Sequence, residues 1–120
     1  MADQLRRTED AVAPIVGRTT KPWFRPPFGS WTAAVREGVG QAGWAYTVMW
    51  DIDTIDWRPT SDGGPTATDI VARVLSRAEG GSIVLMHLGG WNTLDALPGI
   101  LAGLRERGLQ PVTLSEMFGS

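Results

Sequence analysis

The sequence predicts an α/β domain built on parallel strands. Short apolar runs alternate along the chain with longer segments whose apolar residues recur at helical spacing, and this alternation is typical of β-α units. Polar residues follow several of the short runs, and the carboxyl ends of parallel strands meet at one edge of a sheet. The clearest example is His87, the single histidine of the chain, which follows the apolar run Ser82–Met86. A functional site is therefore expected at the strand ends.

The helices are predicted from apolar periodicity together with capping residues and glycine stops. Thr66 with Asp69 resembles a capping box, and Gly108 follows the last long periodic segment. The expected helices are Asp3–Val16, Ser30–Gln41, Thr66–Ala78 and Thr93–Arg107.

The strands are predicted from short apolar runs bounded by glycine or proline. Pro26 and Pro27 should end the first one, because proline cannot donate to a ladder. A loop is expected over Asp51–Pro65, which is rich in Asp, Thr, Gly and Pro, and Ser115 is expected to cap a final helical turn. The expected strands are Trp23–Arg25, Trp44–Trp50, Ser82–Met86 and Pro111–Leu114.

Composition limits the classes of function. The 120 residues are 42% hydrophobic with a formal net charge of -2, which indicates a single domain over 1–120 and argues against a nucleic-acid surface. Cysteine is absent, so disulfides and thiolate metal sites are excluded, and one histidine cannot build a zinc site from several imidazoles. The polar segment Met1–Asp10 is neither a signal peptide nor a membrane span, and the compartment stays undetermined.

Polar and aromatic residues gather after three of the predicted strands. Each has a structural alternative when taken singly: a loop hydrogen bond for the histidine, a salt bridge for the arginine, turn capping for the aspartates and core packing for the tryptophan. Their joint placement at one edge favours a functional site. The residues are Arg25, Asp51, Asp53, Asp56, Trp57 and His87.

Three ordered motifs resemble those of the polysaccharide deacetylase (NodB homology) family. Arg25–Gly29, with the sequence RPPFG, is similar to the Arg-x-Pro-Tyr-Gly motif of the family. Asp53–Trp57, DTIDW, matches its Asp-x-x-Asp-Trp motif, and Leu85–His87, LMH, matches its Leu-x-His motif. The resemblance extends from about Leu5 to Met117 and implies the C-terminal half of a distorted (β/α)7 barrel.

The resemblance also implies an activity and a role for each matched residue. Family members remove N-acetyl or O-acetyl groups from polymers such as chitin-like polysaccharides, peptidoglycan or xylan. It implies that His87 protonates the leaving group with Asp56 as its partner, that Arg25 orients the catalytic aspartate base, and that Phe28 supplies a backbone N–H to the oxyanion. By the same resemblance Trp57 forms a wall of the substrate cleft and Leu85 contacts the acetyl methyl group.

Two family motifs are missing from the sequence. The Thr-Phe-Asp-Asp-like and His-x-x-x-His-like motifs supply the general base and the ligands of a divalent metal such as zinc, and neither is found. We therefore expect a truncated, inactive fragment with no metal site of its own. A cation site formed by the Asp51–Asp56 loop is a weaker alternative than turn capping.

The expected partner is an acetylated polysaccharide or oligosaccharide. Self-association is expected because a cut barrel leaves an open strand edge, and a separate N-terminal chain with the missing motifs is a further expected partner. The alternative is a non-catalytic carbohydrate-binding or interaction module. Family members are often secreted or associated with the cell envelope, but the sequence predicts no signal peptide or transmembrane segment.

Overall fold

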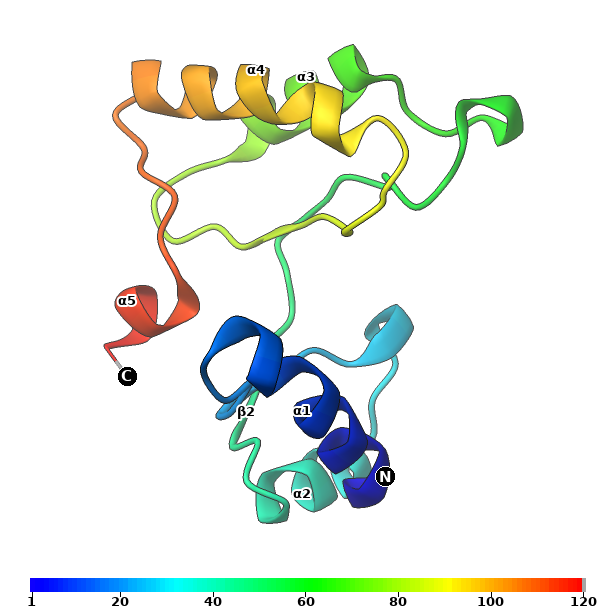
Figure 1. Cartoon of the computed structure of the whole chain (residues 1–120). Helices are drawn as coiled ribbons and strands as arrows, with labels where there is room; N and C mark the ends of the chain where they lie inside the picture. The colour runs from blue at the N-terminus through cyan, green and yellow to red at the C-terminus, as the bar shows by residue number, and fades with distance from the viewer. Residues whose placement is uncertain (120) are drawn as a thin grey trace. The chain divides into compact units, whose positions relative to one another are not determined.

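A computed structural model describes residues 1–119 and divides the chain into two compact units. The first is Met1–Met49, and the second begins at Trp50. Each contains a pair of parallel strands with helices beside it (Figure 1). The expected α/β class with parallel strands is confirmed.

The first unit is formed by α1 (Ala2–Val16), β1 (Trp23–Phe24), α2 (Ala33–Gln41) and β2 (Tyr46–Thr47). In the parallel pair, Trp23 lies opposite Tyr46, and their rings stack with centroids 5.1 Å apart. Val39 of α2 and Trp44 before β2 are buried. The indole N–H of Trp44 donates to Thr20 Oγ1 at 3.0 Å, so the buried ring keeps a polar partner.

The second unit is a β-α-β arrangement followed by two more helices. Strand β3 (Ile52–Asp53) pairs in parallel with β4 (Val84–Leu85), and α3 (Ala67–Arg77) connects them. Helix α4 (Thr93–Glu106) packs along α3, and α5 (Leu114–Phe118) ends the described chain. The core lies between these helices and β3 and consists of Ile52, Ile70, Val74, Ala78, Ala96 and Ile100.

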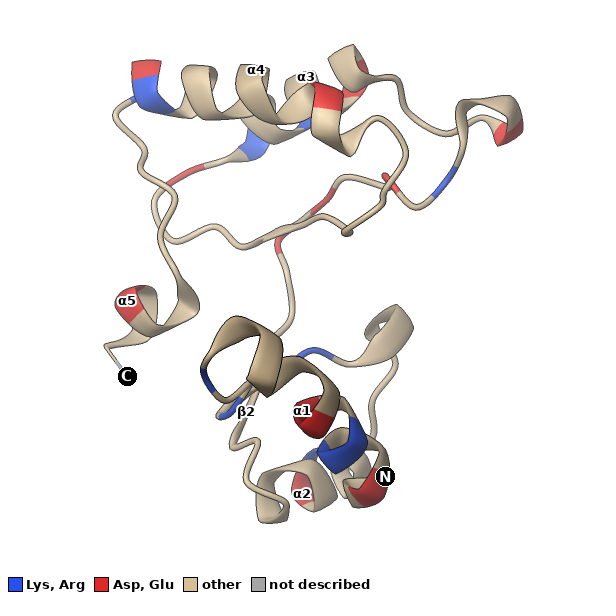
Figure 2. Cartoon of the chain, viewed as in Figure 1, with Lys and Arg blue, Asp and Glu red and all other residues tan. Residues whose placement is uncertain are grey.

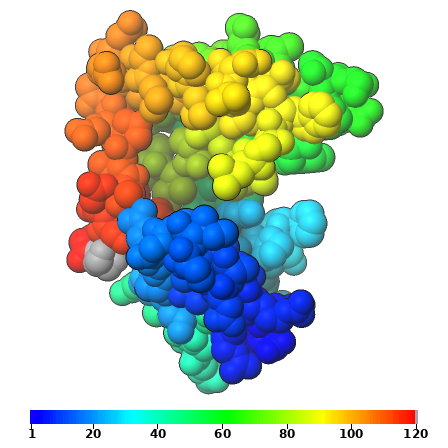
Figure 3. Space-filling view, in the orientation of Figure 1, coloured from blue at the N-terminus to red at the C-terminus, as the bar shows by residue number. Residues whose placement is uncertain are grey.

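Local sequence signals explain where α3 and α4 begin and end. The predicted capping box of α3 is confirmed: Asp69 N–H donates to Thr66 Oγ1 at 3.2 Å, and Thr66 N–H donates to the Asp69 carboxylate at 2.9 Å. Helix α4 has Asn92 in the left-handed conformation before its first residue and Gly108 just beyond its end. Its outer side forms a continuous surface, yellow to orange in Figure 3.

Several predicted boundaries were wrong. Helix α2 is capped by Thr32 rather than Ser30, and α5 by Thr113 rather than Ser115. Only Tyr46–Thr47 of the predicted Trp44–Trp50 strand is a strand, and β3 lies in the segment that we expected to be a loop. Pro111–Leu114 forms no strand, and its last residue begins α5.

Charged residues of both signs lie on the helices of both units (Figure 2). Within the part of the chain that the structure describes, no helix is long and apolar enough to cross a membrane.

Candidate active site

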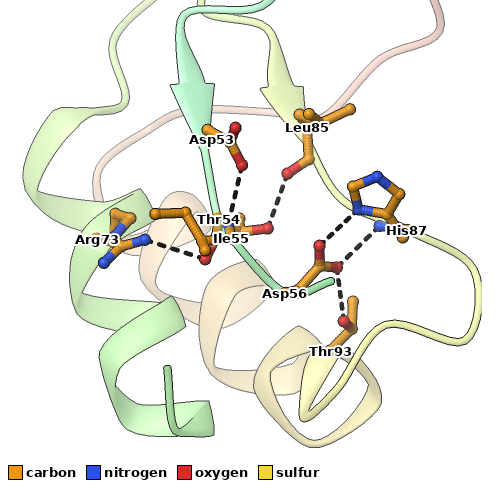
Figure 4. Close-up of polar contacts among 8 residues, drawn as sticks. All are labelled: Asp53, Thr54, Ile55, Asp56, Arg73, Leu85, His87 and Thr93. Carbon is orange, nitrogen blue, oxygen red and sulfur yellow. Dashed lines mark hydrogen bonds and ion pairs between the residues drawn. The ribbon is translucent and has the colours of Figure 1, made fainter. Parts of the chain in front are cut away.

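The second unit brings Asp56 and His87 together (Figure 4). His87 Nδ1 lies 2.7 Å from Asp56 Oδ1, and the His87 backbone N–H donates to Asp56 Oδ2 at 2.8 Å. Asp56 follows β3 and His87 follows β4, so both lie beyond the carboxyl ends of neighbouring parallel strands. The contact that the sequence led us to expect is therefore present in the structure.

The backbone between β3 and Asp56 is held by side-chain hydrogen bonds. Thr54 Oγ1 donates to the Leu85 carbonyl at 2.8 Å, and Arg73 of α3 donates to the Thr54 carbonyl at 3.1 Å. Ile55 has a φ of 57°, which is uncommon for a β-branched residue, and its N–H donates to Asp53 Oδ1 at 2.9 Å. This tight turn directs Asp56 toward His87, and it places backbone strain beside the pair.

Asp56 is fully buried and hydrogen-bonded through both oxygens. In addition to the two contacts with His87, Thr93 Oγ1 donates to Asp56 Oδ2 at 2.6 Å. Burial alone would raise the pKa of Asp56, but the hydrogen bonds from Thr93 and His87 outweigh it and hold this pKa below its usual value. Asp56 is therefore a carboxylate at neutral pH.

The ionised carboxylate determines which ring nitrogen of His87 carries the shared proton. A carboxylate only accepts hydrogen bonds, so Nδ1 of His87 must be the donor toward Asp56 Oδ1. Nε2 points away from Asp56 (Figure 4), and the side chain of His87 is 31% exposed. The arrangement thus leaves Nε2 to exchange a proton with a ligand.

The side chains of Asp51 and Asp53 accept hydrogen bonds from backbone N–H groups. Asp53 accepts the Ile55 N–H, and Asp51 Oδ2 accepts the Ile83 N–H at 2.7 Å. These contacts agree with the turn-capping interpretation of the loop rather than with a cation site.

Apolar residues lie close to Asp56 and His87 in the sequence. Trp57, directly after Asp56, is 58% exposed, and Trp91, after His87, is 56% exposed. Leu85, by contrast, is 9% exposed on β4. Indole rings that remain largely in solvent are suited to form the walls of a binding surface.

Arg25 and Phe28 lie in the first unit. Arg25 is exposed and follows β1, and Phe28 lies in a short 3-10 turn (Pro27–Gly29) with a φ of 57°. The turn's hydrogen bonds are donated by Gly29 and Ser30, so they do not use the Phe28 N–H. Arg25 and Pro27 also line a cleft of about 600 Å³, together with side chains of α1 and β1 such as Leu5 and Trp23.

Several known proteins with similar sequence or structure are polysaccharide deacetylases, and one is a pseudoenzyme of the same family. A peptidoglycan-N-acetylglucosamine deacetylase of Bacillus cereus is 33% identical over 97% of this chain and 41% of its own length. A family 4 carbohydrate esterase from Streptomyces lividans, solved in complex with acetate, superposes with a TM-score of 0.80 at 33% identity, over 99% of this chain and 60% of its own. A family 4 pseudoenzyme from Bacillus anthracis superposes with a TM-score of 0.80 at 30% identity, over 97% of this chain and 38% of its own.

The chain thus resembles polysaccharide deacetylases of carbohydrate esterase family 4 in sequence and in structure. It corresponds to part of their length, since it spans 41% of the Bacillus cereus enzyme and 60% of the solved Streptomyces esterase. No family model matches the sequence. The resemblance that the three motifs indicated is confirmed by these relatives.

Polysaccharide deacetylases are generally metal-dependent. Within residues 1–119, no group of three or more His, Cys, Asp or Glu side chains is arranged to hold a metal ion. The carboxylates beside His87 are already engaged: Asp56 by the histidine and Thr93, and Asp53 by a backbone N–H.

Sequence reasoning missed the residues that support the Asp56–His87 pair. Thr93 was predicted only as the first residue of a helix, and neither Thr54 nor Arg73 was singled out. Thr93 and Thr54 bond to groups more than thirty residues away in sequence, and such pairs leave no local signal. The sequence signal for the Thr93–Asp56 contact is a threonine close after the Leu-x-His motif.

Acid titration should reveal the contribution of Asp56 to stability. The pKa of Asp56 is lower in the folded state than its value of about 3.9 in the unfolded chain. The contribution of Asp56 to stability is therefore fully present above roughly pH 5, and it is lost as the pH falls through the folded-state pKa. Asp56→Asn is expected to lower the free energy of unfolding at pH 7 by about 1 to 3 kcal/mol. The difference between the two proteins should shrink below about pH 4.

Urea unfolding of both proteins between pH 7 and pH 3 would measure this. The capping carboxylates Asp69 and Glu116, whose pKa values are lowered by hydrogen bonds with Thr66 and Thr113, titrate in both proteins and cancel in the difference. A difference that stays constant across this range would contradict the prediction.

Proposed function

We propose that this chain contributes the proton-donor side of a carbohydrate deacetylase site, which hydrolyses N-acetyl or O-acetyl groups of a polysaccharide. The observation that carries the proposal is the hydrogen-bonded pair of Asp56 and His87 beyond the carboxyl ends of β3 and β4. The relatives named above include a peptidoglycan-N-acetylglucosamine deacetylase and an esterase solved with acetate, which supports this class of reaction.

The role of His87 follows from the chemistry of amide cleavage. When the tetrahedral intermediate collapses, the C–N bond breaks and the amine nitrogen needs a proton, because an amide anion is a very poor leaving group. His87 as imidazolium would give its Nε2 proton to that nitrogen, while Asp56 stabilises the cationic ring through Nδ1–H. The exposed Nε2 side and the buried Nδ1 side suit these two tasks.

The remaining residues are assigned by their motifs. Phe28 would donate its backbone N–H to the oxyanion, and its position at the apex of a tight turn keeps that N–H out of the turn's own hydrogen bonds. Arg25 would orient a carboxylate base supplied from outside the described residues. Trp57 would stack on a sugar ring and Leu85 would contact the acetyl methyl group.

The metal ligands and the base would come from outside the described residues, either from further sequence of the same protein or from a complementing polypeptide. This follows because the described residues hold no metal cluster and the chain spans 60% or less of the relatives compared above. We infer that the chain forms one part of a (β/α) barrel domain, the fold of its solved relatives.

A non-catalytic carbohydrate-binding module is the second candidate. The similarity to a solved family 4 pseudoenzyme favours it, because it shows that this fold exists without the activity. The exposed rings of Trp57 and Trp91 would then bind a glycan without hydrolysing it.

Complementation separates these candidates. The chain would be mixed, or fused, with the portion of the Bacillus cereus deacetylase that it does not match, and acetate release from N-acetylated chito-oligosaccharides would be measured with added Zn²⁺ or Co²⁺. We expect no release from the chain alone and metal-dependent release from the combined protein, because we propose that the added portion supplies the metal ligands. The same mixture with a chelator is the control.

The other outcomes are also informative. Metal-dependent acetate release by the chain alone would contradict the need for a complementing polypeptide. Binding of the oligosaccharide without release by either preparation, with perturbation of the Trp57 indole signal, would favour the binding module.

A further inference from the structure

We propose that Thr93, in close contact with Gly90, is a positioning residue that fixes the Asp56 carboxylate so that His87 presents Nε2 outward. The proposal rests on the proposed function for the role of the pair, but it concerns a geometry that can be measured without catalysis.

Besides His87, Thr93 also donates a hydrogen bond to the side chain of Asp56. The Asp56 carboxylate accepts three hydrogen bonds. Two come from the ring and the backbone N–H of His87, and the third comes from the Thr93 hydroxyl at the start of α4. Asp56 and His87 could therefore shift together without breaking their mutual contacts. The Thr93 hydroxyl anchors them to α4, which packs in the core through Ala96 and Ile100.

Burial makes this anchor hard to replace. Asp56 has an exposed fraction of 0% and Thr93 of 8%, so water has little access to the Oδ2 side of the carboxylate. Removing the hydroxyl would leave a buried carboxylate oxygen with one donor fewer, and the carboxylate would be free to rotate in search of another.

Gly90 makes the close approach possible. A Cβ atom at this position would lie 2.3 Å from Thr93 Oγ1 and 2.5 Å from Asp56 Oδ2. The φ of Gly90 lies outside the left-handed region, so the backbone conformation does not require glycine here. The requirement comes from the space that the hydroxyl and the carboxylate occupy.

The hydroxyl of Thr93 does not serve as a helix cap. Asn92 precedes α4 in the left-handed conformation and makes no side-chain capping bond, while Thr93 is already the first helical residue. Its Oγ1 bonds to Asp56 rather than to the first turn of α4. A threonine that only began the helix would not need this contact.

Ring-nitrogen NMR of His87 tests the proposal directly. His87 is the single histidine in the sequence, so its two ¹⁵N ring signals and any Nδ1–H proton signal are assigned without ambiguity. In the unchanged chain, at a pH at which the ring is neutral, we expect a protected Nδ1–H and widely separated nitrogen shifts. In Thr93→Val and Thr93→Ala we expect loss of the Nδ1–H signal to exchange and a smaller separation, whereas Thr93→Ser should keep the original pattern.

Glycine variants give a second, independent test of the proposal. Gly90→Ala should reproduce the effect of Thr93→Val, because its methyl group would force Thr93 and Asp56 apart. Gly80→Ala is the matched control, since a Cβ there meets nothing within 4 Å. Backbone amide spectra would establish that each variant is folded before its ring signals are compared.

The outcomes separate this proposal from the proposed function. If folded Thr93→Val and Thr93→Ala keep the original ring signals, Thr93 does not position the pair and the proposal is wrong. If the ring signals change as expected but the complemented protein never releases acetate, the positioning stands and the deacetylase assignment fails. In an active complemented protein, Thr93→Val should lower kcat with little change in KM, and Thr93→Ser should restore it.

Discussion

Replacing His87 by alanine in the complemented protein is expected to lower kcat for deacetylation of an N-acetylated oligosaccharide by about 10²- to 10⁴-fold, the usual contribution of a general acid. The variant removes the Nε2 proton donor and leaves the amine to depart unprotonated. It also removes the Nδ1 donor to the Asp56 carboxylate, while the backbone N–H of residue 87 can still donate to Oδ2. Initial rates of acetate release at saturating substrate would measure the loss.

The leaving group provides an internal control for this variant. An aryl acetate expels a weakly basic phenolate and needs little proton donation, so His87→Ala should reduce its hydrolysis much less than that of the amide. Asp56→Asn is expected to give an intermediate loss, while Asp95→Asn, an exposed residue of α4, should leave both rates unchanged. Equal losses for amide and aryl ester would exclude His87 as the proton donor.

The helices and the Asp56–His87 contact could be predicted from the sequence because their signals are local or come as recognisable motifs. The capping box of Thr66 and Asp69 depends on residues three apart, and it is present in the structure. The pairing of Asp56 with His87 was implied by two matched motifs at the ends of successive apolar runs, and the parallel register of β3 and β4 brings them together.

The strands were predicted less well, because strand pairing depends on partners that lie far away in the chain. The expected strand Trp44–Trp50 contains only Tyr46–Thr47, which pair with β1, and the next pairing begins at Ile52 opposite Val84. The polar residues Asp51 and Asp53 made this second segment look like a loop. Their side chains in fact accept backbone N–H groups next to the β3–β4 pair.

Introducing a methyl group at Gly64 is expected to destabilise the second unit by about 3 kcal/mol, at the upper end of the range for overpacking. A Cβ atom there would lie 1.8 Å from the Arg58 carbonyl oxygen and 2.7 Å from that of Pro59. Both neighbours are backbone atoms, so the chain itself would have to move. The turn that brings them close is closed by the Gly64 N–H, which donates to the Pro59 carbonyl at 2.9 Å.

The same substitution should also disturb the candidate site. Pro65, the next residue, accepts a hydrogen bond of 3.0 Å from the Asn92 side chain, directly before Thr93. Urea unfolding of Gly64→Ala against Gly80→Ala would measure the stability loss, and we expect less than about 1 kcal/mol for Gly80→Ala, where a Cβ has open space. If Gly64→Ala unfolds at the same urea concentration as Gly80→Ala, the loop can shift at little cost. In that case its backbone does not hold Asn92 and the start of α4 in place beside Asp56.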